Sequence, residues 1–141
     1  MEFQDFVDFA NKNKTCYLAT VEGNQPHVRA LGMWFADDNG FYFQTESVKS
    51  MTGQLRKNNN VELCFTEGMK VMRIMGKVEF VNDEALKARV LEERPFLKDF
   101  IMSPKDPILV LFRVVSGEAY FWTMANNMKE SMIERLRFTA E

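Results

Sequence analysis

The sequence lacks the residues on which most enzyme active sites depend. It has 141 residues but only one histidine, His27, and two cysteines, Cys16 and Cys64, which lie far apart and form no CxxC pair and no metal-ligand cluster. A lone histidine cannot build a zinc site or a Ser-His-Asp triad, and no GxGxxG or P-loop motif is present. We therefore expect no metal centre, and we interpret the cysteines as buried thiols of a reducing, cytoplasmic compartment.

Nucleic-acid and membrane partners are not expected either. Lys and Arg number 18 against 20 Asp and Glu, which gives a net charge of −2, whereas a nucleic-acid binder needs many cations for phosphate contacts. No apolar run approaches the roughly 20 residues that a membrane-spanning helix requires. The first residues, MEFQDF, place no basic segment before an apolar stretch, so they do not indicate a signal peptide.

Strand-forming segments dominate what is present. The chain is 46% hydrophobic and 13% aromatic, which is ample for the core of a single domain over residues 1–141. Runs of β-forming and alternating residues predict strands at 15–21, 27–36, 40–45, 61–66, 70–81, 108–115 and 118–124. Helical spacing predicts helices at 2–13 and 48–57, a helix capped by Asn82, and a helix in the tail over 126–138.

The connections between these strands indicate the fold class. We expect a hairpin loop at 37–40, where Asn-Gly tolerates positive φ, and a turn at 116–117. Gly76, inside the long strand, suggests a bulge or a bend of the kind that barrel corners need. The strands are too closely spaced for regular βαβ crossovers. The sequence therefore predicts a mainly β fold, an antiparallel barrel with short peripheral helices.

The stretch 26–58 offers the best place for a ligand. Arg29 lies in an otherwise apolar strand and needs a partner. It either forms a salt bridge or lies at the barrel rim, or else it contacts a phosphate or another ligand group. The helix start that follows carries Lys49 and Ser50, where free amides favour an anion, although ordinary capping is the alternative. Trp122, on the last expected strand, is either a core residue or an aromatic wall against a flat ligand.

Three further arginines, Arg73, Arg94 and Arg113, lie in apolar surroundings. We expect each of them to form a structural ion pair rather than a ligand contact. The carboxylates are mostly in turns and on helix faces, so a paired-acid glycosidase has no support, and no catalytic residue is assigned.

Four segments, in this order, resemble the FMN-binding split barrel of the pyridoxamine 5′-phosphate oxidase-like superfamily. They are CYLATVEGNQPHVRALGMWF, GFYFQTESVKSMTGQLRKNNNVELCF, MRIMGKVEFVND and GEAYFW. Each segment is a weak signal by itself, but four in the right order are fairly specific. The resemblance covers about residues 3–124.

The resemblance implies a split antiparallel β-barrel that forms a homodimer with FMN between its subunits. In such proteins the flavin performs the redox chemistry, and the protein supplies binding and orientation, so the scarcity of catalytic side chains is no obstacle. The positions that match the family's flavin-binding residues are Arg29, Ala30 and Leu31 on one strand, Thr45 at the end of the next, Lys49 and Ser50 at the phosphate turn, and Trp122 on the last strand.

The chain departs from the oxidase where that enzyme binds its substrate and the flavin phosphate. The paired Arg-Lys of the phosphate turn is reduced to Lys49, the substrate lysine is replaced by Trp34, a glutamine by Val71 and a tyrosine by Val90, whereas Arg94-Pro95 matches. We therefore expect an FMN-dependent oxidoreductase of unknown small-molecule substrate, not a true pyridoxamine phosphate oxidase. The alternatives are a flavin-binding electron carrier or sensor, a barrel that binds haem or a deazaflavin, and a plain structural module.

Overall fold

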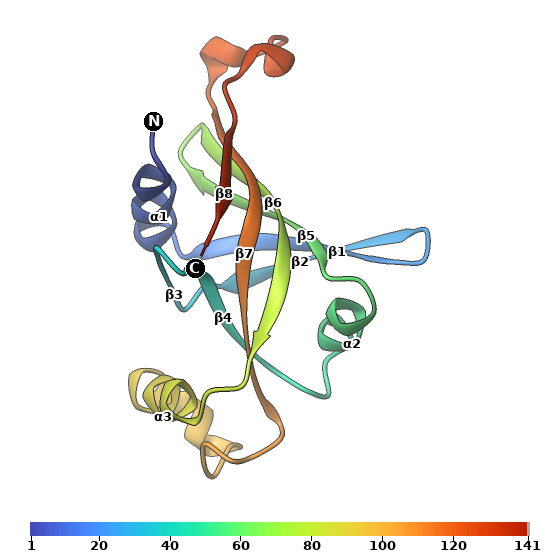
Figure 1. Ribbon diagram of the computed structural model, residues 1–141, viewed down its shortest axis with the longest axis vertical. Coiled ribbons are helices and arrows are strands. Elements are labelled where there is room, and N and C mark those ends of the chain that lie inside the picture. Colours follow the sequence, from blue (N-terminus) through green and yellow to red (C-terminus); the bar gives the residue numbers. More distant parts are fainter. Residues whose placement is uncertain (141) are drawn as a thin grey trace.

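A curled antiparallel sheet with helices around its outside forms the body of the molecule in the computed structural model, which describes residues 1–140 (Figure 1). The strand order is β2-β1-β5-β6-β7-β4-β3, and β8 pairs with β7. The strands are β1 (Thr15–Glu22), β2 (Gln25–Gly32), β3 (Phe35–Asp37), β4 (Gly40–Glu46), β5 (Asn60–Glu67), β6 (Lys70–Val81), β7 (Leu109–Trp122) and β8 (Leu136–Thr139). The predicted mainly β split barrel is confirmed.

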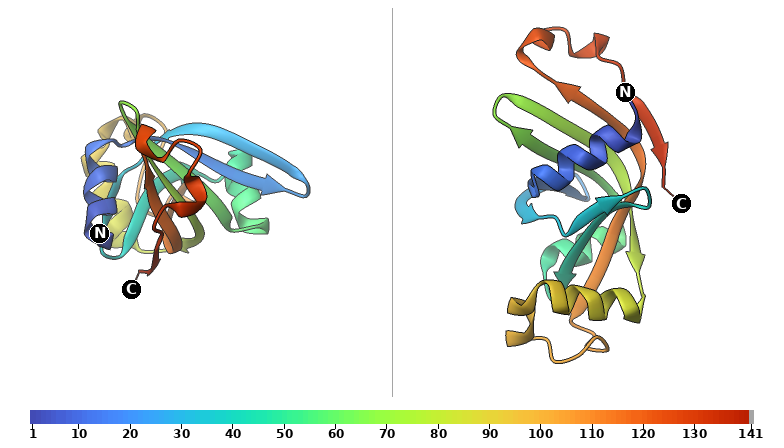
Figure 2. Two further views of the ribbon diagram at one scale, coloured as in Figure 1. Left: turned by 90° about the horizontal axis from the view of Figure 1, so that it is seen from above. Right: turned by 90° about the vertical axis from the view of Figure 1, so that its left-hand side faces the viewer.

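Three α-helices and three short 3-10 helices cover this sheet. They are α1 (Phe3–Lys12), α2 (Ser50–Lys57) and α3 (Glu84–Glu93), with η1 (Pro95–Asp99), η2 (Met124–Asn126) and η3 (Glu130–Met132). Helix α3 and η1 lie at one end of the molecule, and η2 and η3 lie at the other (Figures 1 and 2). Within the described residues, no helix is both long enough and apolar enough to cross a bilayer.

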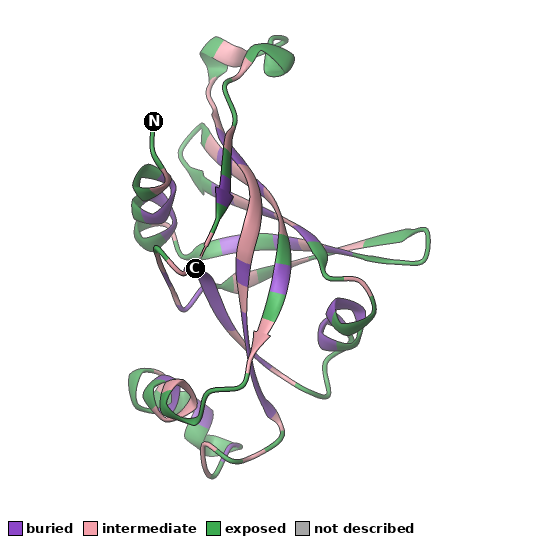
Figure 3. Cartoon of the chain, in the orientation of Figure 1, coloured by how far each residue is buried: buried purple, intermediate pink, exposed green. Residues whose placement is uncertain are grey.

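The main core fills the inside of the curled sheet, as the purple segments of Figure 3 show. Strand β5 illustrates the pattern, because Val61, Leu63 and Phe65 are buried while the residues between them are not. This alternation follows from the period of two along a strand. Of the two cysteines, Cys16 belongs to the core, but Cys64 faces the other side of the sheet and is only half-buried. The prediction of two buried thiols is thus wrong for Cys64.

A second, smaller core fixes α3 and explains why residues 27–36 are not one strand. The strand breaks after Gly32, because the N–H of Trp34 donates to the Tyr42 carbonyl at 3.0 Å and the indole turns into the second core. There the indole Nε1 donates to Glu93 Oε1 at 2.9 Å, and the guanidinium of Arg89 lies 5.1 Å from the ring. These contacts come from a distant helix, so local alternation could not predict the break.

The segments 108–115 and 118–124 form one continuous strand, β7, rather than two strands joined by a turn. The register against β6 shifts between Lys77 and Val78, and Val115 is the extra residue of this bulge. Gly117 has φ +154°, and a Cβ there would overlap the Met75 carbonyl oxygen. The predicted bulge near Gly76 is confirmed, but its extra residue lies on the neighbouring strand.

The tail is not the helix that the spacing of its apolar residues predicts. It makes two short 3-10 turns and then the strand β8, which pairs with β7 from Ser116 to Ala119. A positive φ of 64° at Met128 is incompatible with a continuous helix. Two smaller expectations also change, since α2 begins at Ser50 and α3 is capped by Asp83, whose side chain accepts from the N–H of Leu86.

Candidate functional site at the start of helix α2

Arg29 is held against helix α2 by two neutral side chains. Its Nη1 donates to Thr20 Oγ1 at 2.8 Å, and its Nη2 donates to Gln54 Oε1 at 2.7 Å. The Thr20 hydroxyl in turn donates to the same Gln54 oxygen at 2.6 Å. Thr20 and Gln54 are both buried, so this triangle fixes the guanidinium beside the helix.

The charge of Arg29 has no carboxylate partner within residues 1–140. Its hydrogen bonds all go to neutral oxygens, including a longer one to the Leu18 carbonyl at 3.4 Å. Burial accordingly lowers the pKa of the guanidinium, although arginine remains charged at any physiological pH. A half-buried cation without a counter-ion favours an anionic ligand, because buried charges are otherwise paired. The salt bridge is therefore wrong within residues 1–140, whereas the barrel-rim position and the ligand contact both agree with these bonds.

Helix α2 begins in a way that opposes its own dipole. Its N-cap is Lys49, where a small acceptor such as Ser or Asp is preferred, no side chain caps the helix, and its first turn holds no acid. The N–H groups of Ser50 and Met51 have no acceptor in the described part of the chain. Free amides beside a lysine form an anion site, since an anion satisfies both the amides and the dipole.

Glu46 and Thr45, at the end of β4, lie beside the corner between strand β2 and the start of helix α2. Glu46 accepts from Gln44 Nε2 at 2.8 Å and lies 3.4 Å from the Lys49 ammonium, so its negative charge is already engaged. Thr45 is only 2% exposed, and within residues 1–140 its Oγ1 has no hydrogen-bond partner. A buried hydroxyl without a partner costs about 1–3 kcal/mol.

Ala30 and Leu31 lie next to this corner but on opposite faces of strand β2. Leu31 packs on the core side with Arg29, whereas Ala30 is exposed on the outer side. Because β2 is the last strand of the sheet, one of its edges pairs with no other strand. Alternate backbone N–H and C=O groups of this edge are available for a ligand with a planar hydrogen-bonding ring.

Trp122 is not brought to this corner by its own chain. It pairs with Val71 at the start of β6, and the strands β1, β5 and β6 separate it from β2 in the sheet. Figure 1 shows that β7 ends near η2, away from α2. Trp122 also points to the outer side, because its neighbour Phe121 packs on the core. Within one chain, Trp122 therefore lies on a strand that three others separate from the strand of Arg29.

The other three arginines differ among themselves. Arg73 forms ion pairs with Glu62 and Glu130, and Arg113 pairs with Glu79, as expected. Arg94 forms no ion pair within residues 1–140, which contradicts the prediction. It donates instead to the carbonyls of Gly32 and Met33 and to Gln44 Oε1, and burial lowers its pKa. These bonds fasten α3 to the end of β2.

Sequence reasoning missed Thr20 and Gln54. For Thr20 a signal exists, because it continues the buried alternation of Cys16 and Leu18 with a polar side chain. A polar residue at a core position of a strand needs a partner. Gln54 carries no such signal, since an amide on a short helix is normally exposed.

The fold and this corner define a split-barrel protein with a candidate anion site beside an edge strand. The chain belongs to the pyridoxamine 5′-phosphate oxidase family, whose model matches residues 3–123. A comparison with curated protein sequences gives no significant match.

Several solved structures resemble the chain over most of its length. A NimC/NimA family protein from Clostridium acetobutylicum has a TM-score of 0.79 and 25% identity, over 96% of this chain and 92% of that one. General Stress Protein 26 from Bacillus anthracis has a TM-score of 0.74 and 20% identity, over 98% and 100%. An FAD-binding protein from Mesorhizobium loti has a TM-score of 0.64 and 18% identity, over 81% and 88%. These three proteins share the split-barrel fold of this chain.

Proposed function

We propose that this protein binds FMN at the corner between β2 and α2 and is an oxidoreductase that acts on a small molecule. The observation that carries the proposal is the half-buried guanidinium of Arg29, fixed beside the helix start with no carboxylate partner in residues 1–140. The flavin-binding neighbour from Mesorhizobium loti supports a flavin as the ligand.

The residues at the corner fit FMN in three respects. The terminal phosphate matches Lys49, Ser50 and the free amides of the first turn, with Arg29 as a second cation. The planar ring matches the open edge of β2 at Ala30 and Leu31, which offers backbone donors and acceptors. The unpartnered hydroxyl of Thr45 supplies one further hydrogen bond.

Bound FMN would supply hydride or electron transfer, and the residues described would bind and orient it. Pyridoxamine phosphate is a poor candidate for the substrate. The position of the oxidase's substrate lysine is occupied by Trp34, which is 3% exposed and hydrogen-bonded to Glu93. Val90, in place of the tyrosine, is fully buried. The substrate phosphate would therefore lose two of its contacts.

A homodimer is part of the proposal, because one chain leaves the site incomplete. Trp122 is directed to the outer face of the sheet, away from the corner of its own chain. Apolar side chains on the outer face of β1 and β2, including Tyr17 at 46% and Val28 at 71% exposure, offer a surface for a second copy. In that arrangement Trp122 of one copy would line the flavin site of the other.

Flavin titration tests the cofactor assignment. The purified protein is stripped of ligand and titrated with FMN, and quenching of flavin fluorescence gives Kd. We expect Arg29→Gln to weaken binding by roughly tenfold or more, because a hydrogen bond to a charged group is lost. Arg137→Gln is the matched control, since Arg137 is 86% exposed. A wild type that does not bind FMN, or equal affinity in the two variants, contradicts the proposal.

Mixing two variants that each lack one residue of the proposed shared site tests that site. Arg29→Gln and Trp122→Ala chains are each prepared alone and then unfolded and refolded together. A mixed dimer has one site with neither change, so we expect it to recover high-affinity FMN binding at up to about half of its sites. No recovery in a confirmed mixed dimer means that Trp122 serves the site of its own chain or none. Turnover with a panel of reductants and acceptors then separates an enzyme from an electron carrier.

A further inference from the structure

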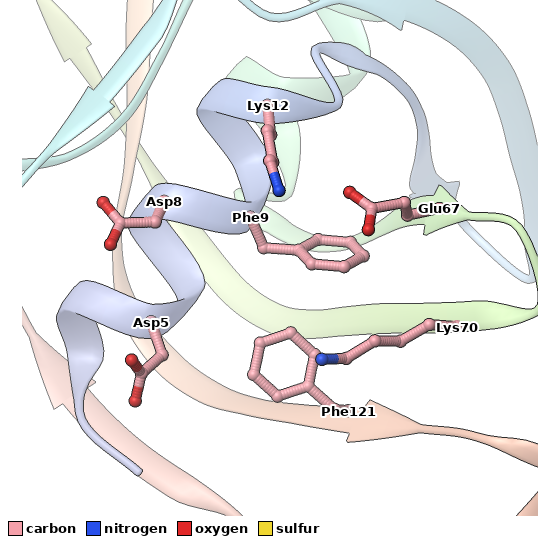
Figure 4. Close-up of a pocket in the computed structure, with 7 residues that line it drawn as sticks. All are labelled: Asp5, Asp8, Phe9, Lys12, Glu67, Lys70 and Phe121. Carbon is pink, nitrogen blue, oxygen red and sulfur yellow. The ribbon is translucent and has the colours of Figure 1, made fainter.

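Two hollows outside the proposed flavin corner differ in the net charge of the residues that line them. The larger, of about 490 Å³, lies between α1 and the adjoining ends of β5, β6 and β7 (Figure 4). It is lined by the three carboxylates of Asp5, Asp8 and Glu67 against the two ammonium groups of Lys12 and Lys70, so its lining carries a net charge of −1. The Lys70 ammonium already lies 4.4 Å from the centre of the Phe121 ring. This hollow therefore does not favour an anionic ligand.

The second hollow, of about 270 Å³, lies where β6 ends, between the last turn of α2 and the first turn of α3. Arg56 contributes from α2 and Lys87 from α3, with Asn82 from the link between β6 and α3. No carboxylate lines it. The net charge of its lining is therefore positive, whereas that of the hollow beside α1 is negative.

Neither cation of this hollow forms an ion pair within residues 1–140. The acids closest in sequence to Lys87 are Asp83 and Glu84, and Asp83 is occupied as the cap of α3. The guanidinium of Arg56 lies over the Phe80 ring, 4.3 Å from its centre. One face of the guanidinium therefore packs on the ring, and its N–H groups stay available to donate to a ligand. Two cations from different helices that line one hollow favour an anionic group between them.

The floor of the hollow is apolar and includes an open strand edge. Leu109 and Leu111 are 1% exposed, and Phe80 is half-buried beside them. The last pair of the β6–β7 ladder is Val81 with Leu111, so β7 continues to Leu109 without β6 beside it. A buried apolar floor accepts a hydrocarbon body, and an open edge adds backbone hydrogen bonds.

We propose that this hollow is a binding site for a small amphipathic anion, with a carboxylate or phosphate held by Arg56 and Lys87 and an apolar body resting on Leu109 and Leu111. Its volume is slightly below the roughly 300–1,000 Å³ of drug-sized pockets, which restricts the ligand to one ring or a short chain. The site is separate from the FMN corner, because it uses the opposite end of α2. It does not depend on the proposed cofactor.

Amide NMR of the full-length protein tests the site with phenyl phosphate as the probe. We expect the amides of Phe80, Asn82 and Leu109 to shift together and to saturate. Inorganic phosphate carries only the anion and benzyl alcohol only the ring, so both should shift these amides far less. An equal response to inorganic phosphate or to benzyl alcohol overturns the amphipathic class, and the absence of saturable shifts overturns the site.

Charge-matched double variants complete the test. Arg56→Gln with Lys87→Gln should weaken phenyl phosphate binding roughly tenfold or more, because both charge-assisted contacts are lost. Lys57→Gln with Lys98→Gln removes the same charge outside the hollow and should leave the affinity unchanged. Equal weakening in the two pairs overturns the proposal. If the first pair does not fold, Lys87→Gln alone serves, because Lys87 has no ion pair to break in the described residues.

Discussion

Arg29 Nη2 donates to Gln54 Oε1 over 2.7 Å, and this bond joins the edge strand β2 to helix α2 through a neutral acceptor. A carboxylate in place of the amide would have satisfied the guanidinium completely. The choice of glutamine fixes the position of the cation without cancelling its charge. This property is what an anion site requires, and it can be tested by restoring the missing charge.

Gln54→Glu should stabilise the ligand-free protein and weaken FMN binding. The new carboxylate would accept the same bonds from Arg29 and Thr20 and add charge assistance, which is worth about 1 kcal/mol of unfolding free energy. The same negative charge would oppose the flavin phosphate, with an expected loss of about tenfold in affinity. Thermal unfolding and flavin titration measure the two effects. Gln25→Glu, on the exposed hairpin, is the control, and unchanged FMN affinity in Gln54→Glu would place the phosphate elsewhere.

Lys49→Asn should also stabilise the ligand-free protein and weaken FMN binding, in this case by changing the N-cap of α2. Asparagine is a preferred N-cap and lysine is not, so the ligand-free protein should gain about 0.5–1 kcal/mol. FMN should bind about tenfold more weakly, because the phosphate loses a charge-assisted contact. Lys57→Asn is the matched control in the last turn, where a lysine favours the helix. A stabilised variant with wild-type FMN affinity would remove Lys49 from the site.

Gly117→Ala should destabilise the protein by about 3 kcal/mol or more. Gly117 has φ +154°, and its Cβ would overlap the Met75 carbonyl, so strain and overpacking add together. Gly53→Ala is the contrasting change, because the space around Gly53 in α2 is open. It should stabilise by about 0.5–1 kcal/mol. Urea unfolding measures both, and a cost at Gly117 below about 1 kcal/mol would contradict the bulge as described.

Alkaline pH should destabilise the fold through Cys16. Burial, with a smaller contribution from Cys64, raises the pKa of the Cys16 thiol from 9.0 to about 12. Between these values the unfolded chain releases the proton while the folded chain retains it, so stability falls as pH rises, by about 1.4 kcal/mol per unit.

Unfolding free energies of the wild type and Cys16→Val at pH 8 and pH 10.5 measure this effect. The valine variant fills the buried position without a titrating group, and all other groups are common to both proteins. We expect the wild type to lose about 2 kcal/mol more than the variant over this range. Parallel pH profiles would mean that the thiol ionises in the folded state as it does in the unfolded chain.

The sequence predicted those parts of the fold that depend on local pattern. Strand 70–81 was found with its predicted bounds, because alternation and the flanking turns specify it. The break after Gly32 was missed, since it depends on contacts of Trp34 with a helix some sixty residues later. The tail was predicted as a helix from its apolar spacing, but pairing with β7 overrides that preference.

The candidate site was predicted in part. The resemblance indicated Arg29 and Lys49, and the structure places both against α2. It could not indicate Gln54, because the bond to Arg29 joins residues 25 apart in sequence. The position of Trp122 on β7, which β1, β5 and β6 separate from β2, also depends on strand order, which no local pattern specifies.

The bulge at Val115 changes the phase of strand β7. Before it, Phe112 and Val114 face the core at even positions, whereas after it Ala119 and Phe121 face the core at odd positions. One inserted residue thus exchanges inside for outside over the last half of the strand. Deleting Val115 would turn Trp122 inward and expose Phe121. The aromatic ring on the outer face at this end of β7 is therefore set by the residue count of one strand.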